Sequence, residues 1–463
     1  MRLNFKVKGL GKIEDAEFNL APLTVITGPN GTGKSFFTKT LYSIFRVAED
    51  LNVLDNINSL LKKMIVTLDT FNKEKLLSED KEEQKDILEE LNSINSDLVR
   101  ARTIAIDLQG IIESSLDDNS IFEKTRNKLV NYLGDLDKFH DGNVKLITFQ
   151  EELHKSITKK LNLINAYFRY ISILLDNKPL LFSHFLNEPL EKELKDNFQV
   201  ENISQILQEN FLLSSQELFK ITFSESIDSD IEAATFFKNR PTSVFFESPA
   251  YWRVRDALIA AKMKSGEEYL SGVPKYFFDL DEALRKRSKN ESELLNVYET
   301  IRSELGGEFI IENGQVSYYD DHLEKQISKN LVSFGMTNLG MLNALIKNNV
   351  IKKGSYIFID EPETNLHPDW QVLMIKSLVA LSQSGVNVVI NTHSTEILKY
   401  IEIAFSKIRD EQGEEEIQEL LAVNYLDTDG TTLEFDSDCP VEQAKEALSH
   451  LSSPFFDLYM QGQ

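Results

Sequence analysis

The stretch GPNGTGKS, residues 28–35, decides the fold of this 463-residue chain. It matches the pattern G-x-x-x-x-G-K-[ST], in which a glycine-rich turn directs backbone N–H groups at phosphate groups from the start of a helix. The preceding residues 23–27, LTVIT, predict a buried strand, and residues 36–45 predict a helix. This order of strand, turn and helix predicts a site for a nucleoside triphosphate.

Different residues of the loop are expected to bind different parts of the nucleotide and its metal ion. We expect the Lys34 ammonium to reach the β- and γ-phosphates and the Ser35 hydroxyl to hold Mg²⁺. The rest of the loop surrounds the phosphates with its backbone. The predicted nucleotide-binding residues of the loop are Gly28, Pro29, Asn30, Gly31, Thr32, Gly33, Lys34 and Ser35.

A second motif, IFIDEPE at residues 357–363, is an apolar strand that ends in carboxylates. Asp360 is the expected second Mg²⁺ ligand, together with Ser35. Glu361 is the expected catalytic residue that accepts a proton from the attacking water or orients it. Adjacent residues at the end of a strand point to different sides, so one carboxylate can face the metal and the next the γ-phosphate.

A third strand, at residues 386–390, leads to the sequence NTHS at residues 391–394. A neutral His393 imidazole in this place can donate a hydrogen bond to the γ-phosphate. A lone histidine after a strand is usually structural, but here it follows two nucleotide-binding motifs. We therefore count His393 as the second expected catalytic residue.

Two kinds of sequence pattern alternate along the chain. Strand and helix patterns alternate at residues 1–48 and again at 236–463, whereas residues 49–235 have few glycines and prolines and a composition typical of helices. We therefore expect an α/β head with a mostly parallel central sheet, divided by an inserted α-helical arm. The strands expected in the second half include a hairpin at 309–319 and another at 421–435.

Apolar residues within the arm recur at alternating spacings of four and three. One such seam runs from Ile87 to Ile112 and a second from Ile157 to Leu175. A heptad spacing is typical of coiled coils, so the two seams predict an antiparallel hairpin of long helices. Two helices of an ordinary bundle would show the same spacing, and the sequence leaves both arrangements open.

The bulk composition limits the function further. The net charge of −24 argues against a broad nucleic-acid-coating surface, although it leaves room for a local basic patch. No apolar run is long enough to cross a membrane, and the single cysteine, Cys439, fits a reducing compartment. We expect a cytoplasmic protein without a membrane partner.

The three motifs together resemble the ATP-binding-cassette (ABC) ATPases of the group that contains SMC proteins, double-strand-break repair heads and OLD proteins. The phrase DEPETNLHP, residues 360–368, is especially similar to the OLD branch. The resemblance implies a P-loop ABC ATPase head that hydrolyses ATP slowly with Mg²⁺. It also implies a homo-oligomer, at least a dimer, that closes each ATP site between subunits.

In this group the opposing subunit offers a serine and a glycine at the start of a helix to the γ-phosphate. The resemblance assigns this part to Ser333 and Gly335, within SFGMT at residues 333–337. The copy departs from the usual L-S-G-G-Q, because Phe334 intervenes and the glutamine is missing. OLD nucleases also carry a TOPRIM domain, and the stretch after His393 is too short to hold one.

An ATPase head without its own effector resembles the ATPase subunits of two-gene antiphage systems of the PARIS and Septu type. That resemblance implies a bacterial defence subunit that controls a separate effector, expected to be a nuclease. The alternative is an SMC-like ATPase of DNA double-strand-break repair that binds DNA directly. A transporter ATPase bound to a membrane permease fits less well, because of the long helical insertion.

Overall fold

The computed structural model describes residues 2–50, 60, 62, 63, 66, 159, 163, 166, 167, 170, 178–215, 218–231, 242–247, 250–266, 269–288, 291–312 and 315–461. The chain divides into two compact units. The first, here called the head, contains Met1–Glu49, Asn187–Glu232 and Arg240–Gln463; the second contains Asp50–Leu186 and Ala233–Asn239. Both heptad seams lie outside the described residues.

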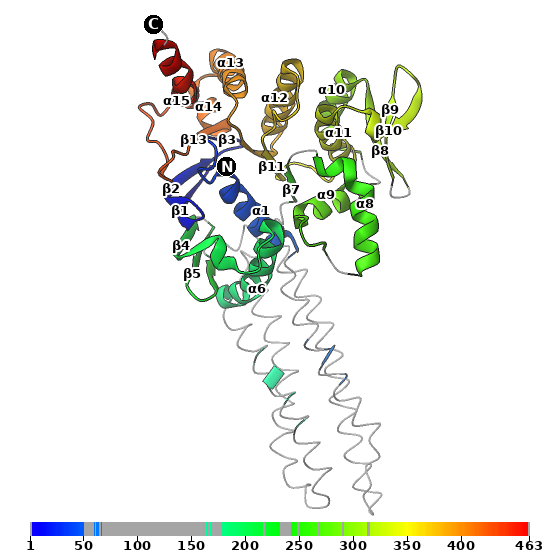
Figure 1. The fold of residues 1–463 in the computed structure, drawn as a ribbon, viewed down its shortest axis with the longest axis vertical. Coiled ribbons are helices and arrows are strands. Elements are labelled where there is room, and N and C mark those ends of the chain that lie inside the picture. The colour runs from blue at the N-terminus through cyan, green and yellow to red at the C-terminus, as the bar shows by residue number, and fades with distance from the viewer. Residues whose placement is uncertain are drawn as a thin grey trace, which may run out of the picture. The chain divides into compact units, whose positions relative to one another are not determined.

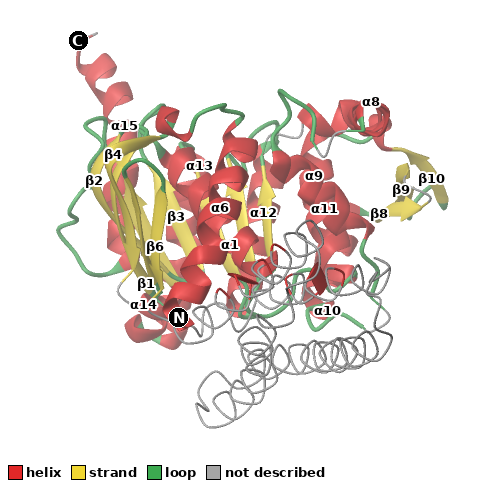
Figure 2. Cartoon of the chain, turned by 90° about the horizontal axis from the view of Figure 1, so that it is seen from below, coloured by secondary structure: helices red, strands yellow, loops and turns green. Residues whose placement is uncertain are grey.

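A five-stranded parallel sheet forms the centre of the head (Figures 1 and 2). Its strand order is β13-β3-β12-β11-β7, and every neighbouring pair runs parallel. These strands are apolar and buried along nearly their whole length, as expected for a sheet covered on both faces. Their bounds are β3 Leu23–Thr27, β7 Ser243–Phe246, β11 Tyr356–Asp360, β12 Asn387–Asn391 and β13 Leu421–Tyr425. The predicted α/β head with a parallel central sheet is confirmed.

Helix α1, Lys34–Asp50, lies between this sheet and a second, antiparallel one. On one side the Phe37 ring stacks on Phe18 with ring centroids 4.0 Å apart. On the other side Tyr42 and Phe45 contact the Phe358 ring of β11, with centroids 6.1 and 5.9 Å apart. Aromatic packing on both faces fixes the axis of α1, and with it the loop that precedes the helix.

The antiparallel sheet has the order β2-β1-β4-β5-β6. Its strands are β1 Leu3–Leu10, β2 Ile13–Leu20, β4 Leu207–Ser215, β5 Phe219–Phe223 and β6 Ile227–Ile231. The last three strands fall within residues 49–235, for which we predicted helix, so that prediction is wrong for residues 207–231. Phe211, Leu213, Phe219 and Ile221 are buried, and their alternation with less buried positions is the strand signal that the overall composition obscured.

Helices cover the other face of the parallel sheet and the end beyond β7. The head helices after α1 are α6 Lys178–Phe198 (in the head from Asn187), α8 Ala250–Ser265, α9 Lys275–Arg285, α10 Leu295–Leu305, α11 Phe334–Lys347, α12 Pro368–Gln383, α13 Thr395–Gln412, α14 Glu414–Leu420 and α15 Pro440–Gln461. Single 3₁₀ turns occupy Ile203–Gln205 and Lys329–Leu331. Ile357 and Ile359 of β11 share a core with Ile375 and Leu378 of α12, so β11 is buried on both faces.

A three-stranded antiparallel sheet adjoins α10 and α11, with the order β10-β9-β8. Its strands are β8 Gly307–Glu312, β9 Gln315–Asp320 and β10 Lys325–Ser328. The β8–β9 pair confirms the predicted hairpin, whose turn residues lie outside the described ones. The second predicted hairpin is present in a shorter form, without the expected strand at 432–435. After β13 the Leu426–Thr432 bridge is flanked by backbone hydrogen bonds from Asp427 to Thr431 at 2.9 Å and from Leu433 to Tyr425 at 2.8 Å.

Candidate nucleotide site

The glycine-rich loop leaves the carboxyl end of β3 and enters α1 at Lys34. Gly28, Gly31 and Gly33 have φ angles of +134°, +75° and +117°, which other residues rarely adopt. At Gly28 a Cβ atom would also lie 2.0 Å from the Leu426 carbonyl oxygen. Among the described residues, no acceptor bonds the backbone N–H groups of residues 31–35. The loop therefore presents backbone N–H donors that have no acceptor among the described residues, an arrangement that fits a bound phosphate chain.

Lys34 is buried inside this loop, with 8% of its surface exposed. Its Nζ donates to the carbonyl oxygens of Gly28 and Pro29, at 2.8 and 2.7 Å. Burial lowers the pKa of Lys34, while the charges of three nearby carboxylates raise it. An ammonium that contacts only neutral carbonyls is available to a stronger, anionic acceptor.

Asp360 stands at the end of β11, next to the loop. Its carboxylate accepts hydrogen bonds from Ser35 and from Asn391 Nδ2, the latter at 3.1 Å. Burial raises the pKa of Asp360, which the two hydrogen bonds lower only in part. A buried carboxylate beside a hydroxyl offers the hard oxygen ligands that Mg²⁺ prefers, so the donor set fits that ion.

Glu361 follows in a strained conformation, with a φ angle of +52°. Its amide still donates to the Asn391 carbonyl oxygen at 2.9 Å, so the chain turns sharply only after this bond. The side chain is half exposed, and its Oε1 lies 3.6 Å from His393 Nδ1. The expected catalytic pair, Glu361 and His393, is thus brought together at the edge of the sheet beside the loop.

Glu363 also belongs to this group, although its position in the motif IFIDEPE predicted no role for it. Its Oε1 accepts hydrogen bonds from the Thr392 hydroxyl at 2.8 Å and the His393 amide at 3.2 Å. The same oxygen lies 3.8 Å from His393 Nδ1, and the other oxygen, Oε2, is buried without a partner among the described residues. Burial raises the pKa of this carboxyl. Glu363 therefore holds the segment that carries His393.

Asn391 is the first residue of the motif NTHS, and the sequence predicted no role for it either. Its Nδ2 donates to Thr38 Oγ1 of α1 at 2.7 Å and to Asp360 at 3.1 Å. The side chain is 2% exposed and ties the end of β12 to both α1 and β11. A buried asparagine directly after an apolar strand was the available signal, because such an amide needs polar partners.

The proposed signature residues begin helix α11, away from the loop in the sequence. Ser333 is the N-cap, and its side chain accepts from the Met336 amide at 3.3 Å. At Gly335 a Cβ atom would lie 2.1 Å from Leu366 Cδ2, so the start of α11 packs against the segment after β11. No hydrogen bond or ion pair among the described residues joins Ser333 to the loop, so the structure does not bring these two predicted parts of the site together.

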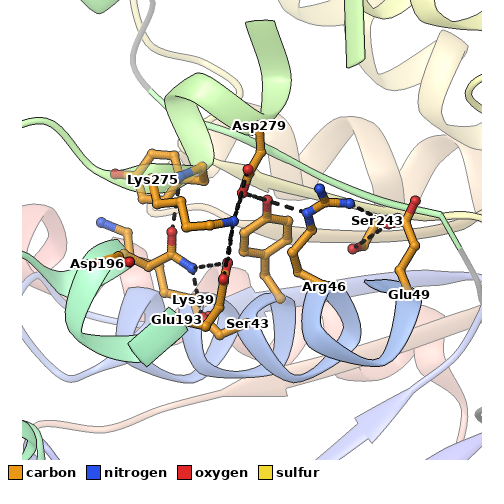
Figure 3. Close-up of polar contacts among 12 residues, drawn as sticks. Lys39, Ser43, Arg46, Glu49, Glu193, Asp196, Ser243, Lys275 and Asp279 are labelled. Carbon is orange, nitrogen blue, oxygen red and sulfur yellow. Dashed lines mark hydrogen bonds and ion pairs between the residues drawn. The ribbon is translucent and has the colours of Figure 1, made fainter. Parts of the chain in front are cut away.

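The opposite half of α1 belongs to a buried polar network (Figure 3). Lys275 of α9 points to Glu193 of α6 and to Asp279, with Nζ–oxygen distances of 3.1 and 2.8 Å. Tyr42 donates to Asp279 at 3.0 Å, and Arg46 lies 3.7 Å from the same carboxylate. The network ties α1 to α6 and α9 through internal charge pairs.

One contact lies between the two ends of α1. Lys39 Nζ donates to Glu247 Oε1 at 2.8 Å, and the Tyr276 hydroxyl donates to the other oxygen of the same carboxylate. Glu247 directly follows β7, the neighbour of β11 in the sheet. The charges of Lys39 and Glu247 also act on the pKa of Asp360, in opposite directions.

Comparisons with known proteins identify the family of this chain. The family model described as AAA ATPase domain matches residues 1–398. Old nuclease of Escherichia phage P2 is 33% identical over 116 residues, which cover 22% of this chain and 20% of that protein. Endonuclease GajA of Bacillus cereus (strain HuB5-5) is 24% identical over 416 residues, which cover 82% of this chain and 53% of that protein.

The chain thus spans about half of GajA and a fifth of Old nuclease. Among solved structures, the SMC head domain from Thermotoga maritima is 10% identical with a TM-score of 0.33, and the match covers 86% of this chain and 92% of that one. Among the described residues, no helix is both long and apolar enough to cross a bilayer. Since the family model covers most of its length, the chain belongs to the AAA ATPase domain family.

Proposed function

We propose that this protein binds ATP with Mg²⁺ at residues 28–35, hydrolyses it slowly, and uses the ATP-bound state to control a separate effector. The observation that carries the proposal is the meeting of Lys34, Asp360, Glu361 and His393 at one edge of the parallel sheet. In the proposed site the loop amides and Lys34 bind the phosphates, and Ser35 and Asp360 hold the metal. Glu361 orients or deprotonates water, and His393 contacts the γ-phosphate.

The proposed catalytic site closes between two copies of the chain. Ser333 begins a helix whose N-terminal N–H groups and dipole suit a γ-phosphate, and it is exposed. Gly335 lets that helix approach Leu366 within the same chain. Two heads that exchange these helix ends would each complete the other's site, so ATP would act as the link between subunits.

The effector in this proposal is a nuclease, and the setting is bacterial antiphage defence in the reducing cytoplasm. Support comes from the similarity to proteins named Old nuclease and endonuclease GajA, and from the resemblance of residues 360–368 to the OLD branch. The charge of −24 favours control of a protein partner over direct coating of DNA.

The test measures the mass of the purified protein in solution by light scattering, with ATP and Mg²⁺, with ADP, and without nucleotide. We expect a dimer or larger assembly with ATP, and no such shift for Lys34→Ala. A protein that stays monomeric under every condition would contradict the shared site. Tight, salt-sensitive DNA binding by the isolated protein would instead support the alternative of a DNA repair ATPase.

A further inference from the structure

Lys12 lies in the turn between β1 and β2, far from the glycine-rich loop in sequence but beside it in space. Its Nζ lies 3.6 Å from the position that a Cβ atom would take on Gly31. Gly31 itself is exposed at the middle of the loop, and its amide has no acceptor among the described residues. An ammonium and a set of unfilled amide donors therefore face the same space.

The turn that carries Lys12 is held in place from two sides. On one side the Gly11 amide donates to the Ile206 carbonyl at 2.8 Å, and Gln208 Nε2 donates to the Gly11 carbonyl at 3.0 Å. On the other, the Glu14 amide donates to the Gly430 carbonyl at 3.0 Å. The position of the Lys12 backbone is thus fixed by contacts of the chain itself, before any ligand binds.

Gly430 lies in close contact with the backbone of the Lys12 turn. Its φ angle is +80°, and a Cβ atom there would lie 2.2 Å from the Lys12 carbonyl oxygen. Asp429 stabilises the surrounding turn, because its Oδ1 accepts hydrogen bonds from the Thr431 amide and hydroxyl at 3.0 and 2.7 Å. The turn around Gly430 therefore lies in close contact with the backbone of the Lys12 turn.

The charge of Lys12 is not balanced by an ion pair in the part of the chain that the structure describes. Among the described residues, no ion pair within 4.0 Å involves Lys12. Lys6 and Lys8, which precede it on β1, both pair with Asp15. In a chain with 74 acidic and 50 basic residues, a cation that has no ion pair among the described residues and lies beside a phosphate-binding loop is chemically suited to an anion.

We propose that Lys12 is a nucleotide-binding residue that contacts the phosphate chain of ATP in addition to Lys34. The inference rests on the proposed function, because it requires ATP in the loop. Lys34 approaches from within the loop, bonded to Gly28 and Pro29, whereas Lys12 approaches from the β1–β2 turn. Two ammonium groups from different elements would enclose the phosphates more firmly than the loop alone.

The experiment measures ATP affinity by calorimetric titration at two salt concentrations, with Mg²⁺ present. We expect Lys12→Gln to weaken binding about tenfold, the effect of losing one charged hydrogen bond, and to reduce its salt dependence. Lys12→Arg, which keeps the charge, should stay close to the wild type. Lys8→Gln is the matched control on the same hairpin and should leave the affinity unchanged.

A second variant tests the placement rather than the charge. Gly430→Ala should displace the Lys12 turn and weaken ATP binding, provided that circular dichroism shows the protein folded. Unchanged affinity in Lys12→Gln, with binding lost in Lys34→Ala, would overturn the role of Lys12 alone. Unchanged affinity in both Lys12→Gln and Lys34→Ala would overturn the proposed function as well.

Discussion

Buried charged groups lie at both ends of helix α1, but only at one end do opposite charges pair with each other. At the C-terminal half, here called the closed end, Lys275 pairs with both Glu193 and Asp279, at 3.1 and 2.8 Å. At the N-terminal end, here called the open end, Lys34 contacts only neutral carbonyls. Glu363 lies at the same end and has a buried oxygen without a partner among the described residues. Buried charge that is satisfied internally stabilises structure, whereas buried charge left open marks the place for a ligand.

The largest expected effect concerns the catalytic carboxylate at the open end. Glu361→Gln keeps the shape of the side chain but removes the base, so ATP hydrolysis should fall about 10²- to 10⁴-fold. ATP binding should remain, because the loop and Lys34 are untouched. Phosphate release and nucleotide titration on the same preparation separate the two effects. Hydrolysis at the wild-type rate would remove Glu361 from the reaction.

The closed end should respond through stability instead. Lys275→Met removes the cation that pairs with both Glu193 and Asp279 in the buried network, which should lower the free energy of unfolding by about 3–5 kcal/mol. The double variant with Glu193→Gln should recover part of this loss. Denaturant unfolding gives the values, and ATP affinity of the folded variant should not change. A loss below about 1 kcal/mol would mean that this network is not the structural end of α1.

The stability that the closed end contributes to the folded protein should depend on pH in a definite direction. Burial raises the pKa of Glu193 to about 7, against the opposing effect of the Lys275 charge. Between about pH 4.5 and 7 the native state therefore binds more protons than the unfolded state, so stability falls as the pH rises through this window. We expect this carboxyl to contribute on the order of 1–3 kcal/mol across the window.

The matched variant for the pH effect is Glu193→Gln, which cannot titrate. Thermal unfolding of both proteins from pH 4.5 to 7.5 should show a smaller dependence on pH for the variant, after the shared background is subtracted. Parallel curves would show that another group controls the slope.

The smallest expected effect defines the boundary between the two ends. Lys39 pairs with Glu247 at 2.8 Å, but both side chains are partly exposed, so Lys39→Met should cost only about 1 kcal/mol. Lys6→Met, which removes an exposed pair with Glu17, is the control and should cost less. If Lys39→Met also weakened ATP binding as strongly as Lys34→Ala, the boundary would lie further along α1.

Sequence patterns predicted the open end better than the closed one. The loop, the acidic strand end and His393 each occupy a short continuous motif, and the parallel sheet brings their strand ends together by a simple rule. The closed end joins Glu193, Lys275 and Asp279 from two helices distant in sequence. A single charged residue on a helix is usually solvated, so nothing in the sequence marked these three as partners.

The strands at residues 207–231 were missed for a related reason. Their side chains are buried against β1 and the neighbouring core, a contact set by the fold rather than by local composition. Glu363 and Asn391 were visible in quoted motifs, but their roles follow from contacts with Thr392, Thr38 and Asp360, which only the arrangement of strands reveals.

The most direct test of the comparison is the thermal stability of wild type, Lys34→Ala and Lys275→Met, each with and without ATP and Mg²⁺. A ligand that binds the native state raises the unfolding temperature. We expect ATP to raise the unfolding temperature of the wild type and of Lys275→Met, which starts lower, but not that of Lys34→Ala. An equal rise in Lys34→Ala, or its loss in folded Lys275→Met, would contradict the assignment of the open end as the nucleotide site.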